Sequence, residues 1–197
     1  MSKECSHQEA VREVVRTLKE YGYIVKTEAW ASTILGHRDC YIDSSGDFDV
    51  ERWYRDFKFN VANMFLGRHS PWISIHNPNF QTRLDVVGLY YADCEELSLY
   101  SFFARTDPFE VAKRTILVEV EHRHSLEEAI KRIKDYPAGR KVILWTGGEI
   151  GGVLEEIPIV VAKKYEGDCY ISLEFTDILE EHIREIKGKN RHKWLPF

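Results

Sequence analysis

Hydrophobic and polar positions along the chain follow two periods, one typical of helices and the other of strands. A first helix is predicted from Ser6 to Gly22. Ser6 and Glu9 form a capping box at its start, and Gly22 supplies its C-terminal stop. Apolar residues three, four and seven positions apart form its buried stripe, namely Val11, Val14, Val15 and Leu18.

Strand patterns follow in segments that are bounded by turn residues. Alternating or continuous apolar residues predict strands over 23–30, 72–76, 82–91, 97–104, 114–124, 140–146, 157–164 and 169–175. Further helices are predicted over 50–66, from 126 to Pro137, and over 177–187. This order of helix, strands, helix, strand and a smaller strand-and-helix end indicates an α/β domain with a mixed sheet.

The strand over 114–124 carries charges where an apolar strand would be expected. Glu119, Glu121 and Arg123 alternate along it, so they project from one face. Burying such a row is costly unless the charges have partners. Upstream, Asp85 lies in another predicted strand. If the two strands are neighbours, Asp85, Glu119 and Glu121 converge on one point.

Two interpretations of these carboxylates stay open. Clustered carboxylate oxygens suit a hard cation such as Mg²⁺ or Mn²⁺, held here by Asp85 and Glu119. Such an ion could polarise a phosphodiester and activate water. In the other interpretation the face is exposed, and Arg83 and Arg123 neutralise the carboxylates in cross-strand ion pairs.

Composition places the chain among globular proteins. Hydrophobic residues make up 44% and charged residues 30% of its 197 residues, enough for one domain over 1–197. The net charge of −5 argues against a general affinity for nucleic acid, although not against a local basic patch. Without an apolar run of membrane-spanning length or a signal peptide, we expect a cytoplasmic protein that does not enter a membrane. The cysteines are far apart and are predicted to be reduced thiols: Cys5, Cys40, Cys94 and Cys169.

The charged strand and its neighbours resemble the PD-(D/E)XK nuclease superfamily, which has a restriction-endonuclease-like fold. In that core a helix precedes a strand hairpin with Asp, a strand with E-x-K, a helix and another strand. Leu84-Asp85 matches the Asp position, and Glu119-Val120-Glu121 matches (D/E)-x-K. The resemblance divides the chain into a core over 5–30 and 80–146, an insertion over 31–80, a β-plus-helix C-terminal extension over 147–187 and a basic tail over 188–197.

This resemblance implies a nuclease that hydrolyses DNA with Mg²⁺ or Mn²⁺ and that can act as a homodimer. Asp85, Glu119 and Glu121 would be its catalytic residues. The spacing of Arg132 and Tyr136 is similar to the Q-x-x-x-Y motif of RecB-type members, which also use a His from the first helix, here His7.

The sequence departs from the family pattern at the motif lysine, which is Glu121 here. Helical geometry places neither Lys131 nor Lys134 well to replace it, and it directs Glu9 to solvent rather than to the site. A second hypothesis is therefore a catalytically inactive protein of the same fold, which binds DNA or another protein such as a transcription factor.

Several cationic residues are candidates for contact with nucleic acid. The alternatives are a solvated helix edge for Arg132 and Tyr136 and a solvated tail at the C-terminus. Cations neutralise phosphates, and aromatic rings stack on bases. The candidates are Arg83, Arg123, Arg132, Tyr136, Lys189, Arg191 and Lys193.

Overall fold

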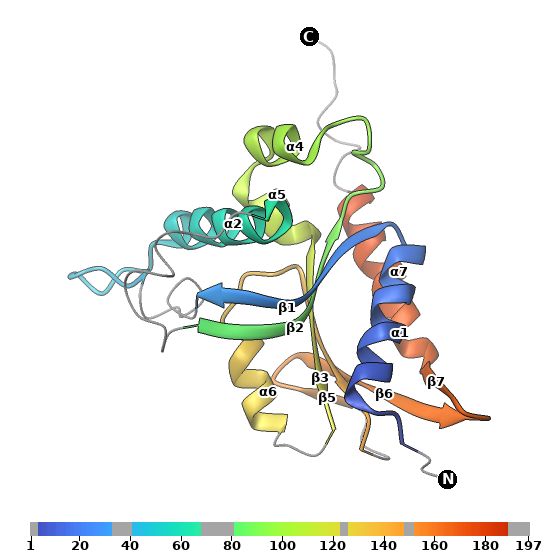
Figure 1. Cartoon of the computed structure of the whole chain (residues 1–197). Helices are drawn as coiled ribbons and strands as arrows, with labels where there is room; N and C mark the ends of the chain where they lie inside the picture. Colours follow the sequence, from blue (N-terminus) through green and yellow to red (C-terminus); the bar gives the residue numbers. More distant parts are fainter. Residues whose placement is uncertain (1–3, 33–40, 68–80, 123–125, 148–151, 189–197) are drawn as a thin grey trace.

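The computed structural model describes residues 4–32, 41–67, 81–122, 126–147 and 152–188 (Figure 1). Its helices and strands are, in chain order, α1 (His7–Glu20), β1 (Tyr23–Ser32), α2 (Val50–Leu66), β2 (Gln81–Tyr90), α4 (Leu99–Arg105), α5 (Pro108–Arg114), β3 (Thr115–Glu121), α6 (Leu126–Ile133), β4 (Arg140–Trp145), β5 (Gly152–Leu154), β6 (Ile157–Tyr165), β7 (Asp168–Ile171) and α7 (Leu173–Gly188).

The strands form one mixed sheet in the order β1-β2-β3-β4-β6-β5, and β7 pairs with β6. The first three strands are antiparallel neighbours, whereas β3, β4 and β6 run parallel. A parallel pair needs a crossover connection, and α6 provides it between β3 and β4. The α/β class with a mixed sheet, predicted from the sequence, is confirmed.

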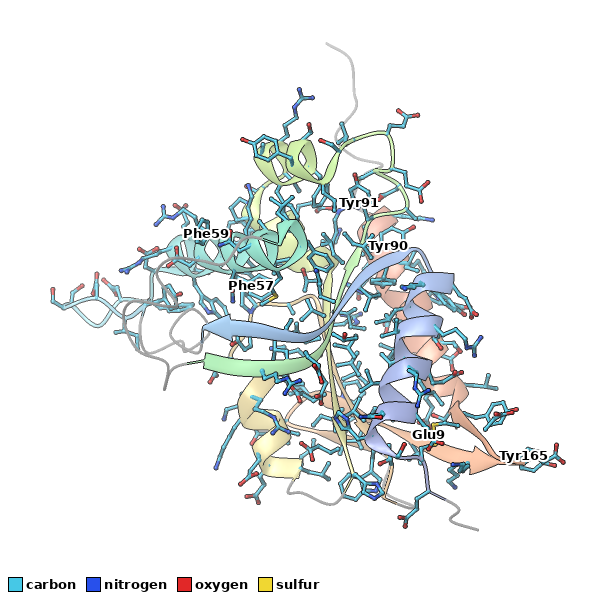
Figure 2. All side chains as sticks on the ribbon, in the orientation of Figure 1. Glu9, Phe57, Phe59, Tyr90, Tyr91 and Tyr165 are labelled. Atoms are coloured by element: carbon cyan, nitrogen blue, oxygen red, sulfur yellow. A yellow bond between two sulfur atoms is a disulfide. The ribbon has the colours of Figure 1, made fainter. Side chains whose placement is uncertain are left out.

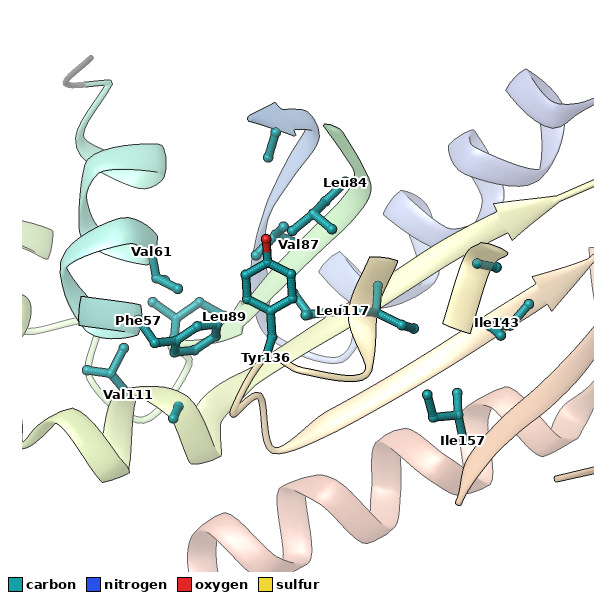
Figure 3. Close-up of a cluster of buried hydrophobic side chains, with 14 of the residues drawn as sticks. Phe57, Val61, Leu84, Val87, Leu89, Val111, Leu117, Tyr136, Ile143 and Ile157 are labelled. Atoms are coloured by element: carbon teal, nitrogen blue, oxygen red, sulfur yellow. The ribbon is translucent and has the colours of Figure 1, made fainter. Parts of the chain in front are cut away.

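Helices cover both faces of this sheet (Figure 1). On one face α1 and α7 pack through residues such as Leu18 and Phe175, both fully buried. On the other face α2, α5 and α6 contribute residues such as Phe57 and Val111 (Figure 3). Strand β3 lies between the two layers, and all seven of its residues are buried. Any charged side chain on β3 is therefore held inside the protein.

Segment 97–104, predicted as a strand, instead contains most of helix α4, which begins at Leu99. Its aromatic residues favour strands, but Ser98 accepts a hydrogen bond from the backbone N–H of Ser101 and caps a helix. The helix buries Phe102 and Phe103 on one side and leaves Tyr100 exposed. Local capping together with helical burial outweighs the strand propensity.

The C-terminal boundaries also differ from the prediction. The strand predicted over 169–175 ends at Ile171, and α7 begins at Leu173 rather than near Asp177. The carbonyl of Ser172 accepts the first helical hydrogen bond, from the N–H of Phe175. The strand predicted over 72–76 lies outside the described residues.

A disulfide joins Cys5 to Cys169, which corrects the prediction of reduced thiols for this pair. The two cysteines are 164 positions apart in sequence, but their Cα atoms are 5.5 Å apart. They meet because the N-terminal end of α1 packs against β7, a contact that the sequence pattern does not reveal. Cys94 is a free, partly buried thiol.

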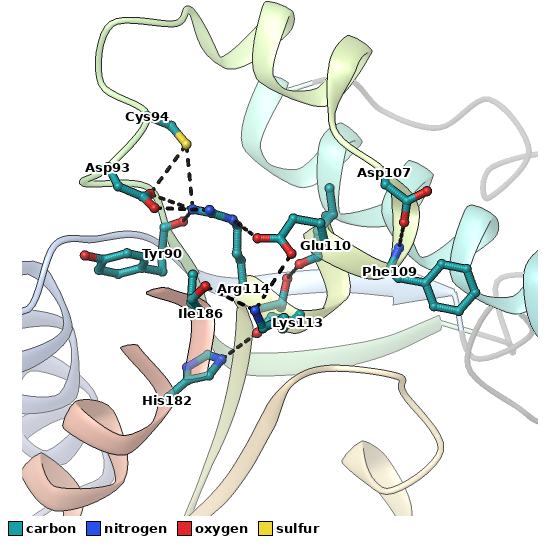
Figure 4. A network of polar contacts seen from close by, with 12 residues as sticks. Tyr90, Asp93, Cys94, Asp107, Phe109, Glu110, Lys113, Arg114, His182 and Ile186 are labelled. Carbon is teal, nitrogen blue, oxygen red and sulfur yellow. Dashed lines mark hydrogen bonds and ion pairs between the residues drawn. The ribbon is translucent and has the colours of Figure 1, made fainter. Parts of the chain in front are cut away.

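A buried arginine ties the α4–α5 region to the sheet (Figure 4). The side chain of Arg114 is only 5% exposed and pairs with Asp93 and Glu110 at 2.6 and 2.7 Å. Two carboxylates that contact one buried cation satisfy its hydrogen-bond donors, so the charge is tolerated there.

The fully buried His182 of α7 predicts a loss of stability in acid. Its Nδ1 lies 2.8 Å from the Tyr23 hydroxyl, and its Nε2 lies 2.6 Å from the Lys113 carbonyl oxygen. Burial lowers the pKa of His182 from 6.5 to about 4. Between these values the unfolded chain binds a proton that the folded chain does not. The free energy of unfolding should therefore fall by about 1.4 kcal/mol per pH unit as pH drops through this range.

Urea unfolding near neutral pH and at about pH 5 measures this loss, with His182→Gln as the comparison. Glutamine has no proton to gain, so the variant should lose about 2 kcal/mol less than the parent on acidification. Equal losses in the two proteins would contradict the assignment.

Candidate functional site

Two carboxylates of β3 lie inside the protein. Glu119 and Glu121 are 1% and 3% exposed. They share the face of β3 that carries Leu117 and that α6 covers. Water cannot solvate carboxylates at this depth, so each needs a proton or a positively charged partner.

Asp85 reaches the same place from β2. The ladder between β2 and β3 ends at Val86 and Val118. Beyond that point, Oδ2 of Asp85 accepts a hydrogen bond of 2.9 Å from the backbone N–H of Val120. The side chain thus replaces the next ladder bond, and the structure brings Asp85 beside Glu119.

His7, the first residue of α1, contacts the same carboxylate. Its Nε2 lies 3.2 Å from Oδ1 of Asp85, and its side chain is 46% exposed. The hydrogen bond to Asp85 raises the pKa of His7. The solvent-accessible side of Asp85 is therefore occupied by a histidine that can carry or release a proton.

Arg132 of α6 is the cation nearest to the two glutamates. Its guanidinium contacts Glu121 through Nη2, and its Nε lies 3.4 Å from Oε2 of Glu119. The side chain is 36% exposed, so it covers the glutamates at the protein surface. These contacts with the glutamates replace the solvated helix edge that was one interpretation of Arg132, and its contact with phosphate stays a prediction.

Sequence reasoning missed this placement, although a signal exists. Arg132 lies between the buried Ile130 and Ile133, at the border of the apolar stripe of α6. A long side chain at such a border can bury its aliphatic part against apolar residues while its charged group reaches a polar partner. The two lysines weighed as replacements are placed differently, since Lys134 lies 3.7 Å from Glu155 and Lys131 is exposed.

Asp85 and Glu119 differ in protonation. Burial, followed by the charge of Asp85, raises the pKa of Glu119 to about 9, and Arg132 only partly opposes this. Burial alone would also raise the pKa of Asp85, but hydrogen bonds from His7 and Val120 outweigh it and lower this pKa. At neutral pH the pair therefore holds one proton, on Glu119, and one negative charge, on Asp85.

One oxygen in this site has no partner. Oε1 of Glu119 is buried and makes no hydrogen bond to any described residue. In folded proteins nearly all buried polar atoms are satisfied by protein, water or an ion. The atom therefore marks a place where the site can accept one more polar or cationic group.

The other predicted site residues lie elsewhere. Arg83 pairs with Glu28 across β1 and β2, rather than with Glu121. Tyr136 is 3% exposed and packs in the core beside Phe57, so its prediction as a nucleic-acid contact is wrong. The remaining candidates lie outside the described residues: Arg123, Lys189, Arg191 and Lys193.

His122, which follows the last residue of β3, contacts protein groups. Its Nδ1 lies 2.7 Å from the Thr146 hydroxyl, and its Nε2 lies 3.9 Å from a Glu4 oxygen. In the described part of the chain, no three or more His, Cys, Asp or Glu side chains are arranged to hold a metal ion. The same residues include no helix of the length and apolarity needed to cross a membrane.

Comparison with known proteins found no similar protein. No family model, curated protein or solved structure matches the chain. A function for this protein therefore has to follow from the chemistry of its own residues.

Proposed function

We propose that this protein has a restriction-endonuclease-like core and hydrolyses phosphodiester bonds of DNA with a divalent cation held by Asp85 and Glu119. The order of α1, the antiparallel β1–β2–β3, α6 and the parallel β4 supports the core, since it agrees with the PD-(D/E)XK arrangement. Within it, Asp85 and Glu119 occupy the two acidic motif positions on adjacent strands.

The pairing of these two carboxylates carries the proposal. Two carboxyl groups this close cannot both ionise without a cation, and Glu119 also has a buried oxygen without a partner. Mg²⁺ commonly binds one or two carboxylates and completes its shell with water and substrate phosphates. A pair of carboxylates therefore fits such an ion even without a third protein ligand.

The residues around the pair have separate tasks in this proposal. A bound Mg²⁺ or Mn²⁺ would supply Lewis acidity toward a phosphate. The backbone of Val120 and the ring of His7 hold Asp85 in place. Arg132, oriented by Glu121, keeps a positive charge at the surface where a phosphate would approach. This guanidinium stands in for the lysine that the motif lacks, although it cannot act as a base.

The contacts of Arg132 favour a second possible function, binding without catalysis. Arg132 already pairs with Glu121 and lies beside Glu119, as a structural ion pair would, and Glu121 stands where the motif has lysine. These features favour a protein of the same fold that binds DNA, or a protein such as a transcription factor, without cleaving anything.

Calorimetric titration with Mn²⁺ tests the proposed site. We expect binding by the parent and an affinity at least about tenfold lower in Asp85→Asn, because the amide removes a charged ligand. Glu185→Gln is the matched control, since Glu185 lies on α7 and pairs with Arg140. Absence of Mn²⁺ binding by the parent, at any attainable concentration, would reject the catalytic proposal. The second function, binding without cleavage, would then remain.

A further inference from the structure

Residues of α2 and α4 line an open trough. Figure 1 shows α4 on the side of α2 that faces away from β1, and Figure 2 labels Phe59 on α2. Its volume is about 450 Å³. Phe57 of α2 points into the core, whereas Phe59, two positions later, lines the trough. The residues that line it are Arg55, Lys58, Phe59, Ala62, Leu66, Tyr100, Phe103, Ala104 and Pro108.

Each helix contributes a coherent face to this trough. On α2, Arg55, Phe59 and Ala62 are four and then three positions apart, so they share one side of the helix. On α4, Tyr100 and Phe103 are three positions apart. The trough is therefore formed by one side of each helix, where the two helices pack together.

Two aromatic rings in the trough are exposed. Phe59 is 49% and Tyr100 is 60% accessible to solvent. Two large rings exposed on adjacent helices form a surface patch of the kind that binds a partner. The trough is open rather than enclosed, so the flat face of a base can reach its rings.

The charges in the trough have one sign. Arg55 and Lys58 line it, and none of the described lining residues is acidic. Lys58 donates a hydrogen bond of 2.7 Å to the Thr106 carbonyl, which fixes its ammonium at the rim. Arg55 is exposed and forms no ion pair with a described residue. On a chain of net charge −5, this local excess favours an anionic ligand.

We propose that the trough between α2 and α4 binds single-stranded nucleic acid, with bases on Phe59 and Tyr100 and phosphates on Arg55 and Lys58. Exposed aromatic rings beside cations are the combination with which proteins bind unpaired strands without sequence preference. The inference rests on the proposed function for the choice of nucleic acid over an acidic peptide. It assigns to the insertion and to α4 the task of holding an unpaired strand.

Fluorescence anisotropy with a labelled oligodeoxythymidylate in EDTA tests this site in the whole protein. We expect the parent to bind, and Phe59→Ala and Tyr100→Ala each to raise Kd about fivefold or more through lost stacking. Arg55→Gln should also weaken binding and flatten its salt dependence. Tyr165→Ala and Arg12→Gln, which remove an exposed ring and an exposed cation elsewhere, should leave Kd unchanged.

Unfolding temperatures of all variants show whether a change in Kd reflects binding alone. Absence of oligonucleotide binding by the parent, or equal Kd values for the parent and the trough variants, would overturn the proposal and leave the trough to a protein partner. Oligonucleotide binding without cation-dependent cleavage would refute only the catalytic proposal.

Discussion

Replacement of Glu119 by glutamine is expected to abolish the proposed cation-dependent DNA cleavage and, at the same time, to stabilise the fold at alkaline pH. The amide has nearly the shape of the protonated carboxyl group that the folded protein holds, so packing is preserved. It cannot carry the negative charge that a divalent cation requires. We expect cleavage to fall by about 10³-fold or more, which corresponds to about 4 kcal/mol.

The stability effect follows from the raised pKa of Glu119. In the unfolded chain this carboxyl ionises near its ordinary pKa of 4.5, whereas in the fold its pKa is about 9. Between these values the folded state holds a proton that unfolding releases. The free energy of unfolding therefore decreases by about 1.4 kcal/mol for each pH unit of rise. Glutamine removes this slope, so the stability difference between variant and parent should widen as pH rises.

Urea unfolding over a pH series, with Glu185→Gln as the control, measures this difference. The control carboxyl is about half exposed, and its replacement should not change the slope. Parallel stability curves for the parent and Glu119→Gln would show that Glu119 is ionised in the folded protein. Retained cleavage by Glu119→Gln would remove this residue from the proposed catalytic pair.

Removal of the Cys5–Cys169 disulfide is expected to lower the free energy of unfolding by about 2–5 kcal/mol. The bond closes a loop across 164 positions, so it restricts the unfolded chain strongly. It also holds the start of α1 against β7, next to the 2.8 Å ion pair of Glu9 with Lys164. Because His7 follows Cys5 by two residues, loosening this end should also weaken the contact between His7 and Asp85.

Chemical unfolding of the parent with and without dithiothreitol, beside a Cys5→Ser/Cys169→Ser variant, tests the disulfide. Reductant should destabilise the parent and leave the double variant unchanged. Cys94→Ser is the control, because Cys94 is a free thiol and its replacement should preserve the response to reductant. A parent whose stability is insensitive to full reduction would contradict the expected effect.

Local signals in the sequence determined several elements correctly. The capping box of Ser6 and Glu9 begins α1, and the helix predicted over 50–66 has these bounds as α2. The charged strand and the apolar strand after it are β3 and β4. Each of these elements depends on residues close together in the chain, whose periodicity and caps are visible in the sequence.

The candidate site could be found from the sequence only in part. Alternation along β3 placed Glu119 and Glu121 on one face, and Asp85 stood in a strand that could be their neighbour. Burial of that face could not be predicted, because it depends on α6, which covers it. The sequence suggested Arg83 and Arg123 as partners of the carboxylates. Arg83 pairs with Glu28 instead, and only the packing of α6 brings Arg132 to the glutamates.

The sequence by itself determined the order of most helices and strands and the acidic character of one central strand. Tertiary structure decided which distant residues meet: Asp85 with the backbone of Val120 and with His7, Arg132 with the glutamates, and Cys5 with Cys169. It also decided that 97–104 is a helix, since burial of Phe102 and Phe103 favours that form. Periodicity and capping act over a few residues, whereas these pairings depend on how distant elements pack, and their energies exist only once the chain has folded.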